Sequence, residues 1–181
     1  MQIGKLLFYP IEKDYNAVAP QIKEALTGRD YAKDVFVASI NPELADTDFF
    51  CKEYDVAHAI STNCLVVEAR RADKKWYAAW LILATDMADI NGVVRRQLDA
   101  RKISFAPMDT ALELTKMEYG GITPIGLPES WTILVDKSVM NNDVVVIGGG
   151  TRGSKLAINT KIFPELPNTK ILPITKQKQL L

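Results

Sequence analysis

The sequence is poor in the side chains that form disulfides or bind metal ions. Its 181 residues include two cysteines, Cys51 and Cys64, and a single histidine, His58. This set is too small for a disulfide framework or for the ligands of a structural zinc ion. We therefore predict no metal and no cofactor, and we expect both cysteines to be reduced and at least half-buried.

Long apolar runs are also absent. The longest, from Tyr77 to Ala84, is far shorter than the roughly 20 residues that a membrane-spanning helix needs. The N-terminus lacks the basic segment followed by an apolar one that a secretory signal peptide requires. These absences exclude the membrane classes and predict a soluble, cytoplasmic protein with no membrane partner.

The chain carries no net charge, because 22 lysines and arginines balance 22 aspartates and glutamates. Zero net charge gives no general attraction to nucleic acid, and DNA is not a predicted partner. The stretch from 70 to 102 is nevertheless basic, with 8 lysines and arginines against 4 acidic residues. These side chains form a phosphate-facing surface if the fold gathers them; otherwise they are solvated charges at strand ends and on a helix face. They are Arg70, Arg71, Lys74, Lys75, Arg95, Arg96, Arg101 and Lys102.

Composition and hydrophobic periodicity predict one α+β domain. The chain is 48% hydrophobic and 24% charged, as in ordinary globular proteins. Predicted strands mostly follow one another directly, with helices interspersed irregularly, which favours a mixed sheet over a regularly alternating parallel one. Prolines and scattered lysines predict a loosely packed tail over 164–181. The predicted strands are 5–9, 34–40, 63–69, 76–84, 102–105, 131–135, 143–147 and 155–158. The predicted helices are 16–26, 46 or 47 to 54, 89 or 91 to 98, and 107–115.

A glycine–proline loop lies between two of these elements, from Gly120 to Pro128. Its glycines permit backbone conformations closed to other residues, while Pro124 and Pro128 fix φ and remove two N–H donors. Apart from the Thr123 hydroxyl, the segment Gly-Gly-Ile-Thr-Pro offers no acid, base or nucleophile. Any chemistry at this loop is therefore expected to use its main chain.

A second glycine-rich loop runs from Gly148 to Gly153 and formally matches the dinucleotide pattern Gly-x-Gly-x-x-Gly. It lacks the following helix, further βαβ units and acidic residue of that fingerprint, and it fails the phosphate-loop pattern for similar reasons. Two readings remain: an anion-binding turn flanked by Arg152 and Lys155, or a hairpin turn that needs glycine. His58 is expected to be structural, because nothing places a serine or an acid beside it for a catalytic triad.

These features together resemble the YbaK-like family of aminoacyl-tRNA editing domains, which includes free-standing deacylases and the domain inserted in bacterial prolyl-tRNA synthetases. The resemblance is strongest over 45–158 and is most specific in the glycine–proline loop and the strand that follows it. The other matching features are the strand from Asn63 to Val67, the segment from Tyr77 to Ala84 followed by a helix, and the glycine turn after Val146.

The resemblance implies a compact editing-type domain over 1–163, with a curved, mixed and largely antiparallel sheet flanked by helices. It also implies hydrolysis of the ester that joins a wrong, small amino acid to the 3′ end of a tRNA. Such editing is needed because an apolar pocket rejects a smaller amino acid only weakly. The implied catalytic residues are Asn63, Gly120, Gly121, Thr123, Pro124 and Asp136. The implied substrate-binding residues are Ile122, Gly149, Arg152, Lys155, Arg70 and Arg71, with Trp76 or Tyr119 as stacking surfaces.

One residue departs from the family pattern. Asn63 stands where the family usually has a lysine, and a neutral donor in place of a charged one forfeits on the order of 1 to 2 kcal/mol. Three alternatives are open: Asn63 donates to the same oxygen, an arginine enters from another strand, or the protein is a non-catalytic relative that binds tRNA or another ligand.

Overall fold

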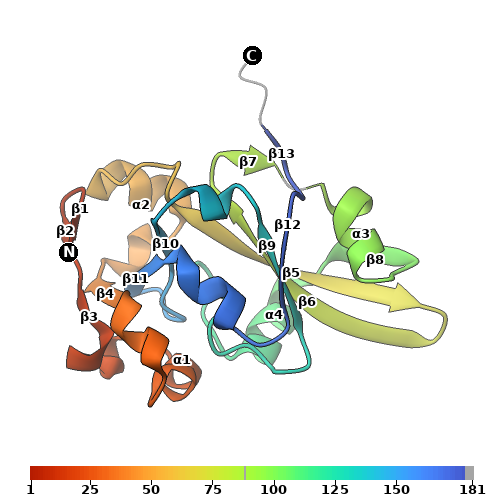
Figure 1. Ribbon diagram of the computed structural model, residues 1–181, viewed down its shortest axis with the longest axis horizontal. Coiled ribbons are helices and arrows are strands. Elements are labelled where there is room, and N and C mark those ends of the chain that lie inside the picture. The colour runs from red at the N-terminus through yellow and green to blue at the C-terminus, as the bar shows by residue number, and fades with distance from the viewer. Residues whose placement is uncertain (88, 178–181) are drawn as a thin grey trace.

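Two β-sheets form the framework of the protein, seen in a computed structural model that describes residues 1–87 and 89–177 (Figure 1). The smaller sheet has the strand order β10-β11-β4-β3, and each strand is antiparallel to its neighbours. Its strands are β3 (Tyr9–Pro10), β4 (Val35–Ser39), β10 (Val144–Gly148) and β11 (Ser154–Asn159).

The larger sheet has the order β12-β9-β6-β5-β8 and is mixed. Its strand β9 runs parallel to both neighbours, whereas β5 is antiparallel to β6 and to β8. The charged segment between β5 and β6 turns at Ala72, whose φ of 49° is left-handed. Its strands are β5 (Thr62–Arg71), β6 (Lys74–Leu83), β8 (Lys102–Phe105), β9 (Thr132–Asp136) and β12 (Thr169–Leu172).

The two sheets meet at the start of β5. Ser61 forms a parallel bridge with Val146 of β10, and the Thr62 hydroxyl donates to the Val146 carbonyl oxygen at 3.1 Å. This contact fixes the end of one sheet beside the beginning of the long hairpin of the other.

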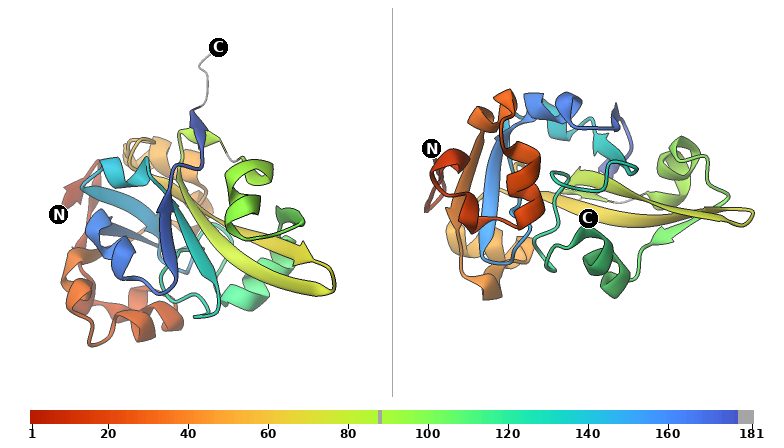
Figure 2. Two further views of the ribbon diagram at one scale, coloured as in Figure 1. Left: turned by 45° about the vertical axis from the view of Figure 1, so that its right-hand side comes forward. Right: turned by 90° about the horizontal axis from the view of Figure 1, so that it is seen from below.

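Short helices cover the sheets. Helices α3 (Arg95–Gln97) and α4 (Met108–Thr115) lie on opposite sides of the β5–β6 hairpin (Figure 2, right). Helix α1 (Pro20–Leu26) begins with proline, whose fixed φ suits a first helical position, and α2 (Thr47–Tyr54) buries Phe50. The remaining elements are β1 (Gln2–Ile3), β2 (Leu6–Leu7), β7 (Asp86–Met87), β13 (Lys176–Gln177), η1 (Ile11–Lys13), η2 (Tyr15–Ala17), η3 (Asp30–Asp34), η4 (Pro42–Leu44), η5 (Ile90–Val94), η6 (Val139–Asn141) and η7 (Thr160–Glu165).

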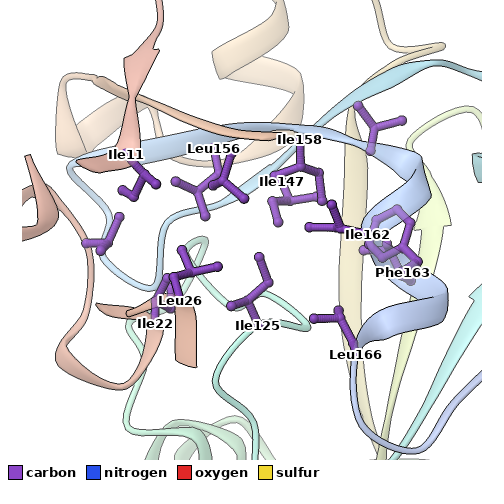
Figure 3. Packing of buried hydrophobic residues seen from close by; sticks show 14 of the residues in the cluster. Ile11, Ile22, Leu26, Ile125, Ile147, Leu156, Ile158, Ile162, Phe163 and Leu166 are labelled. Atoms are coloured by element: carbon purple, nitrogen blue, oxygen red, sulfur yellow. The ribbon is translucent and has the colours of Figure 1, made fainter. Parts of the chain in front are cut away.

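The largest apolar cluster lies between the smaller sheet and α1. Ile22 and Leu26 of α1 belong to it together with Ile147 and Leu156 of the sheet (Figure 3). Ile125, from the glycine–proline loop, is fully buried in the same cluster. Burying such a side chain stabilises its position by roughly 1.5 to 3 kcal/mol, so the core anchors the loop.

The predicted fold class is confirmed, since helices and mixed sheets make up one α+β fold. The predicted strand at 5–9 is wrong: its residues are divided between β2 and β3, which pair with β1 and β4 respectively. The expected loose packing after 164 also fails for the described residues, because β12 joins the larger sheet. Leu166 and Ile174 are 5% and 3% exposed, so burial of apolar side chains outweighs the effect of the prolines.

Over 1–87 and 89–177, no helix has the length and apolar character needed to cross a membrane.

Candidate active site

The loop from Gly120 to Gly126 is shaped by close main-chain contacts. The Gly150 N–H donates to the Gly121 carbonyl oxygen at 2.8 Å. A Cβ at Gly121 would lie 2.6 Å from the Thr151 carbonyl oxygen, and one at Gly148 would overlap the Gly121 carbonyl oxygen. Only glycine permits such approaches, so the two glycine-rich loops pack main chain against main chain.

A hollow of about 430 Å³ opens between this loop, α2 and the start of β5. Strand β8 pairs with β5 only from Val67 onward, so β8 does not cover the start of β5. Four of the predicted site residues line the hollow: Asn63, Gly120, Ile122 and Lys155. The fold therefore brings together residues from β5, β11 and the loop.

Lys155 enters the hollow from β11 and is only 6% exposed. Its Nζ donates to the carbonyl oxygens of Ala45 at 2.8 Å and Gly120 at 3.2 Å, and lies 5.1 Å from the centre of the Phe50 ring. No carboxylate in the described part of the chain forms an ion pair with it. Burial lowers the pKa of Lys155 to about 8, against the opposing effect of nearby acidic groups. At neutral pH the ammonium group is thus mostly charged, and its charge is not neutralised by a partner.

Asn63 presents a neutral donor to the same hollow. The Thr47 hydroxyl donates to Asn63 Oδ1 at 2.7 Å. This bond orients the amide, and its Nδ2 group has no acceptor among the residues that the structure describes. Two N–H donors of Asn63 are therefore available to a bound molecule.

Arg152 holds the loop and does not reach the interior of the hollow. Its Nε donates to the Pro42 carbonyl oxygen and its Nη1 to the Tyr119 carbonyl oxygen, each at 3.0 Å. The guanidinium group also lies 5.6 Å from the centre of the Tyr119 ring. We interpret Arg152 as the residue that orients Tyr119, which lines the hollow and is 47% exposed.

Asp136 lies elsewhere, because β6 separates its strand from β5. Its carboxylate accepts main-chain N–H bonds from Ser138 at 2.7 Å, Ile174 at 2.7 Å and Thr175 at 2.6 Å. Burial alone raises the pKa of Asp136, but these hydrogen bonds outweigh it and lower the pKa below its ordinary value. Asp136, implied by the resemblance as a catalytic residue, therefore does not lie beside Asn63, and its carboxylate fastens the C-terminal segment to β9.

Arg70 and Arg71 stand at the far end of β5. Arg70 lies seven steps along the strand from Asn63, which corresponds to about 23 Å. Arg70 pairs with Glu68, Nε to Oε1 at 2.6 Å, and Arg71 pairs with Asp99. Neither arginine lines the hollow beside Asn63.

Three further predicted residues do not line the hollow. Pro124 borders a separate hollow next to α1, and the Gly149 carbonyl oxygen accepts from the main chain of Ala19. Thr123 is fully buried, and its hydroxyl has no hydrogen-bond partner in the described chain. His58 is hydrogen-bonded to Asp48, Nε2 to Oδ1 at 3.1 Å, so an acid does stand beside it, contrary to the expectation. The two side chains are 46% and 93% exposed, and His58 does not line the hollow.

Sequence reasoning missed Thr47, Gly148 and Met108, all of which line the hollow. Thr47 was predicted only as a possible start of the helix over 46 or 47 to 54, but Asp46 holds the N-cap position of α2 and the Thr47 hydroxyl bonds to Asn63. The glycine that ends a buried strand was the available signal for Gly148. No local pattern marks Met108, because only the packing of α4 brings it to the hollow.

The sequence matches a family model described as an aminoacyl-tRNA editing domain over residues 41–165. A solved structure of a proposed trans-editing enzyme for prolyl tRNA synthetase has a TM-score of 0.73 and 16% identity, covering 88% of this chain and 99% of that chain. The solved structure of a hypothetical protein has a TM-score of 0.75 and 16% identity, and the match covers 86% of this chain and 99% of that chain. The structure of a proposed signal transduction protein from Marinobacter aquaeolei VT8 has a TM-score of 0.58 and 14% identity, and the match covers 87% of this chain and 31% of that chain. A comparison with curated proteins finds no match.

Identities this low establish the shared fold alone, whereas the family model covers more than half of the chain. The matched residues include both glycine-rich loops and the side chains that line the hollow. The resemblance to YbaK-like editing domains is thus confirmed. The chain belongs to the family of aminoacyl-tRNA editing domains.

Proposed function

We propose that this protein is a trans-acting deacylase that hydrolyses the ester between a small amino acid and the 3′ end of a mischarged tRNA. The observation that carries the proposal is the pair of donors beside the Gly120 main chain, the Lys155 ammonium group and the Asn63 amide. Negative charge develops on the carbonyl oxygen as an ester is hydrolysed, and prepositioned donors stabilise that charge.

The proposed reaction uses water directly. The water oxygen adds to the ester carbonyl carbon and loses a proton, the bond to the ribose oxygen breaks, and that oxygen takes up the proton lost by the water as the amino acid leaves. Lys155 stabilises the charge on the carbonyl oxygen, and Asn63 holds the ester or the terminal ribose. Cys64 lines the hollow but is a poor nucleophile, because burial raises the pKa of its thiol to about 12.

The size and lining of the hollow support a small amino acid. Its volume of about 430 Å³ lies near the lower end of the roughly 300 to 1,000 Å³ found for ligand pockets. The terminal ribose must share this space with the amino acid. Leu65 and Ile122 supply apolar walls that suit a short side chain.

The direct test incubates the protein with tRNAs misacylated with alanine, serine, threonine and larger amino acids, and follows loss of the ester. We expect hydrolysis of one or more of the small-residue esters, and a rate at least tenfold lower for Lys155→Met. Lys161→Met removes an exposed lysine outside the hollow and should leave the rate unchanged. Binding of the tRNA without ester loss across the panel would instead identify a non-catalytic relative.

A paired substitution tests whether Lys155 supplies the charge that Asn63 lacks. Lys155→Met should be partly rescued by adding Asn63→Lys, because both positions line the same hollow. Asn63→Lys alone should raise the hydrolysis rate of the wild type by less than it raises that of Lys155→Met, because it adds a second ammonium group near the first. Equal loss in the single and double variants would mean that the ester does not lie between these two positions.

A further inference from the structure

An edge strand connects the hollow to a second, basic hollow. Strand β8 is one of the two edge strands of the larger sheet, and Met108, three residues beyond its end, lines the hollow described above. Lys102, Ile103 and Ser104 of the same strand border a second hollow of about 450 Å³. The two hollows therefore lie along one edge of the sheet, joined by the segment from Phe105 to Pro107.

The second hollow carries positive charge that the protein does not neutralise. Arg95, Arg101 and Lys102, here called the basic edge, line it and are exposed. None of the three forms an ion pair with a carboxylate in the part of the chain that the structure describes. The carboxylate of Glu68 also borders this hollow, but it is bound by Arg70. The excess charge is local, since the chain as a whole is neutral.

Large apolar side chains are exposed between and around the two hollows. Phe49, Met108 and Tyr119 line the mouth of the first hollow and are 61%, 46% and 47% exposed. Phe105 follows on β8 and is 50% exposed. These four side chains, here called the apolar rim, are four of the nine large apolar side chains found exposed in the described chain. Aromatic surfaces next to a basic groove are the combination by which proteins bind single-stranded nucleic acid.

We propose that the unpaired 3′ end of the tRNA lies along this edge, with its bases on the apolar rim and its phosphates on the basic edge. This inference rests on the proposed function, because it places the terminal ester in the first hollow. The six steps of chain from Lys102 to Met108 span at most about 20 Å, which corresponds to at most about six nucleotides stacked at ~3.4 Å. The edge thus matches a short single strand, of no more than about six nucleotides, between the ester and the tRNA duplex.

The test measures binding of unacylated tRNA, and of a single-stranded oligonucleotide with the same 3′ end, at several salt concentrations. The triple variant Arg95→Gln, Arg101→Gln, Lys102→Gln should lose roughly tenfold to a hundredfold in affinity at 0.1 M salt. Its slope of log affinity against log salt should fall by about 2, from 0.7 for each of three lost phosphate contacts. The matched control Lys23→Gln, Arg29→Gln, Lys33→Gln removes the same charge from exposed positions elsewhere and should bind as the wild type does.

Two further measurements separate this inference from the proposed function. Phe105→Ser should weaken binding of both RNAs roughly tenfold without changing the salt slope, because stacking is not an ionic contact. Hydrolysis of an aminoacyl ester of adenosine, which has no RNA to bind, should be the same in the wild type and the triple variant. If neither the wild type nor the variants hydrolyse the misacylated tRNAs or the aminoacyl ester of adenosine, the proposed function is overturned but the binding result is not. Unchanged affinity and slope in the triple variant, or equal losses in the control, would overturn the inference.

Discussion

The stability of the Lys155→Met variant relative to that of the wild type should fall as the pH rises. Methionine has a similar length, so the packing against Phe50 is largely kept. The substitution removes a buried positive charge and also the donors to the carbonyl oxygens of Ala45 and Gly120. Loss of those hydrogen bonds does not depend on pH, whereas the cost of burying the charge does.

The magnitude follows from the pKa of the lysine. Burial lowers the pKa of Lys155 from 10.5 to about 8, so between these values the unfolded chain binds more protons than the folded chain. The free energy of unfolding of the wild type therefore rises with pH in this window. The full effect is about 3 kcal/mol, with the cost complete below pH 8 and absent above pH 10.5. Between pH 7.5 and 9.5 the free energy of unfolding of the wild type should rise by about 2 kcal/mol relative to that of the variant.

Urea denaturation of both proteins at pH 7.5, 8.5 and 9.5 measures this change. The thiol of Cys64, whose pKa burial raises to about 12, destabilises the fold increasingly above pH 9, but it is present in both proteins and cancels in the difference. Cys51, whose pKa is also raised by burial, interacts with Lys155, so the pair is repeated with Cys51→Ala. A difference between wild type and variant that is constant from pH 7.5 to 9.5 would refute the reasoning.

Two further substitutions test the framework of the site. Asp136→Asn should destabilise the protein by about 2 to 4 kcal/mol, because an amide cannot accept from all three main-chain donors, including that of Ser138. Because its folded-state pKa is lowered, the stability that Asp136 contributes is present above its unfolded pKa and is lost as pH falls through the lower value; thermal unfolding from pH 2 to 6 measures this. Gly148→Ala should cost roughly 1 to 3 kcal/mol and most of the deacylation, because its methyl group would overlap Gly121. Gly153→Ala, where a Cβ meets only a side-chain carbon at 3.9 Å, is the control for both readouts.

The sequence was informative where the cause of a structure is local. Alternation and β-branched residues placed β4, β5 and β8 within a few residues, and the glycines and prolines marked the loop at Gly120. Strand order was not accessible in this way, since nothing near Asp136 indicates that β6 separates it from Asn63. The pairing of β12 with β9 was missed for the same reason, because it depends on burial of residues distant in sequence, such as Ile174.

The charge at the hollow depends both on Asn63, where the sequence departs from the family pattern, and on a residue distant in sequence. A missing cation on β5 suggested either a weakened enzyme or an arginine from another strand, and the structure places a lysine from β11 at the hollow instead. The bridge between Ser61 and Val146 brings the two sheets together beside the loop, so that β5 and β11 both contribute residues to the hollow. A positive charge can then enter the same hollow from either sheet while the main chain at Gly120 stays in place. On the proposed function, Lys155 supplies beside the Gly120 carbonyl oxygen the positive charge that Asn63 does not carry.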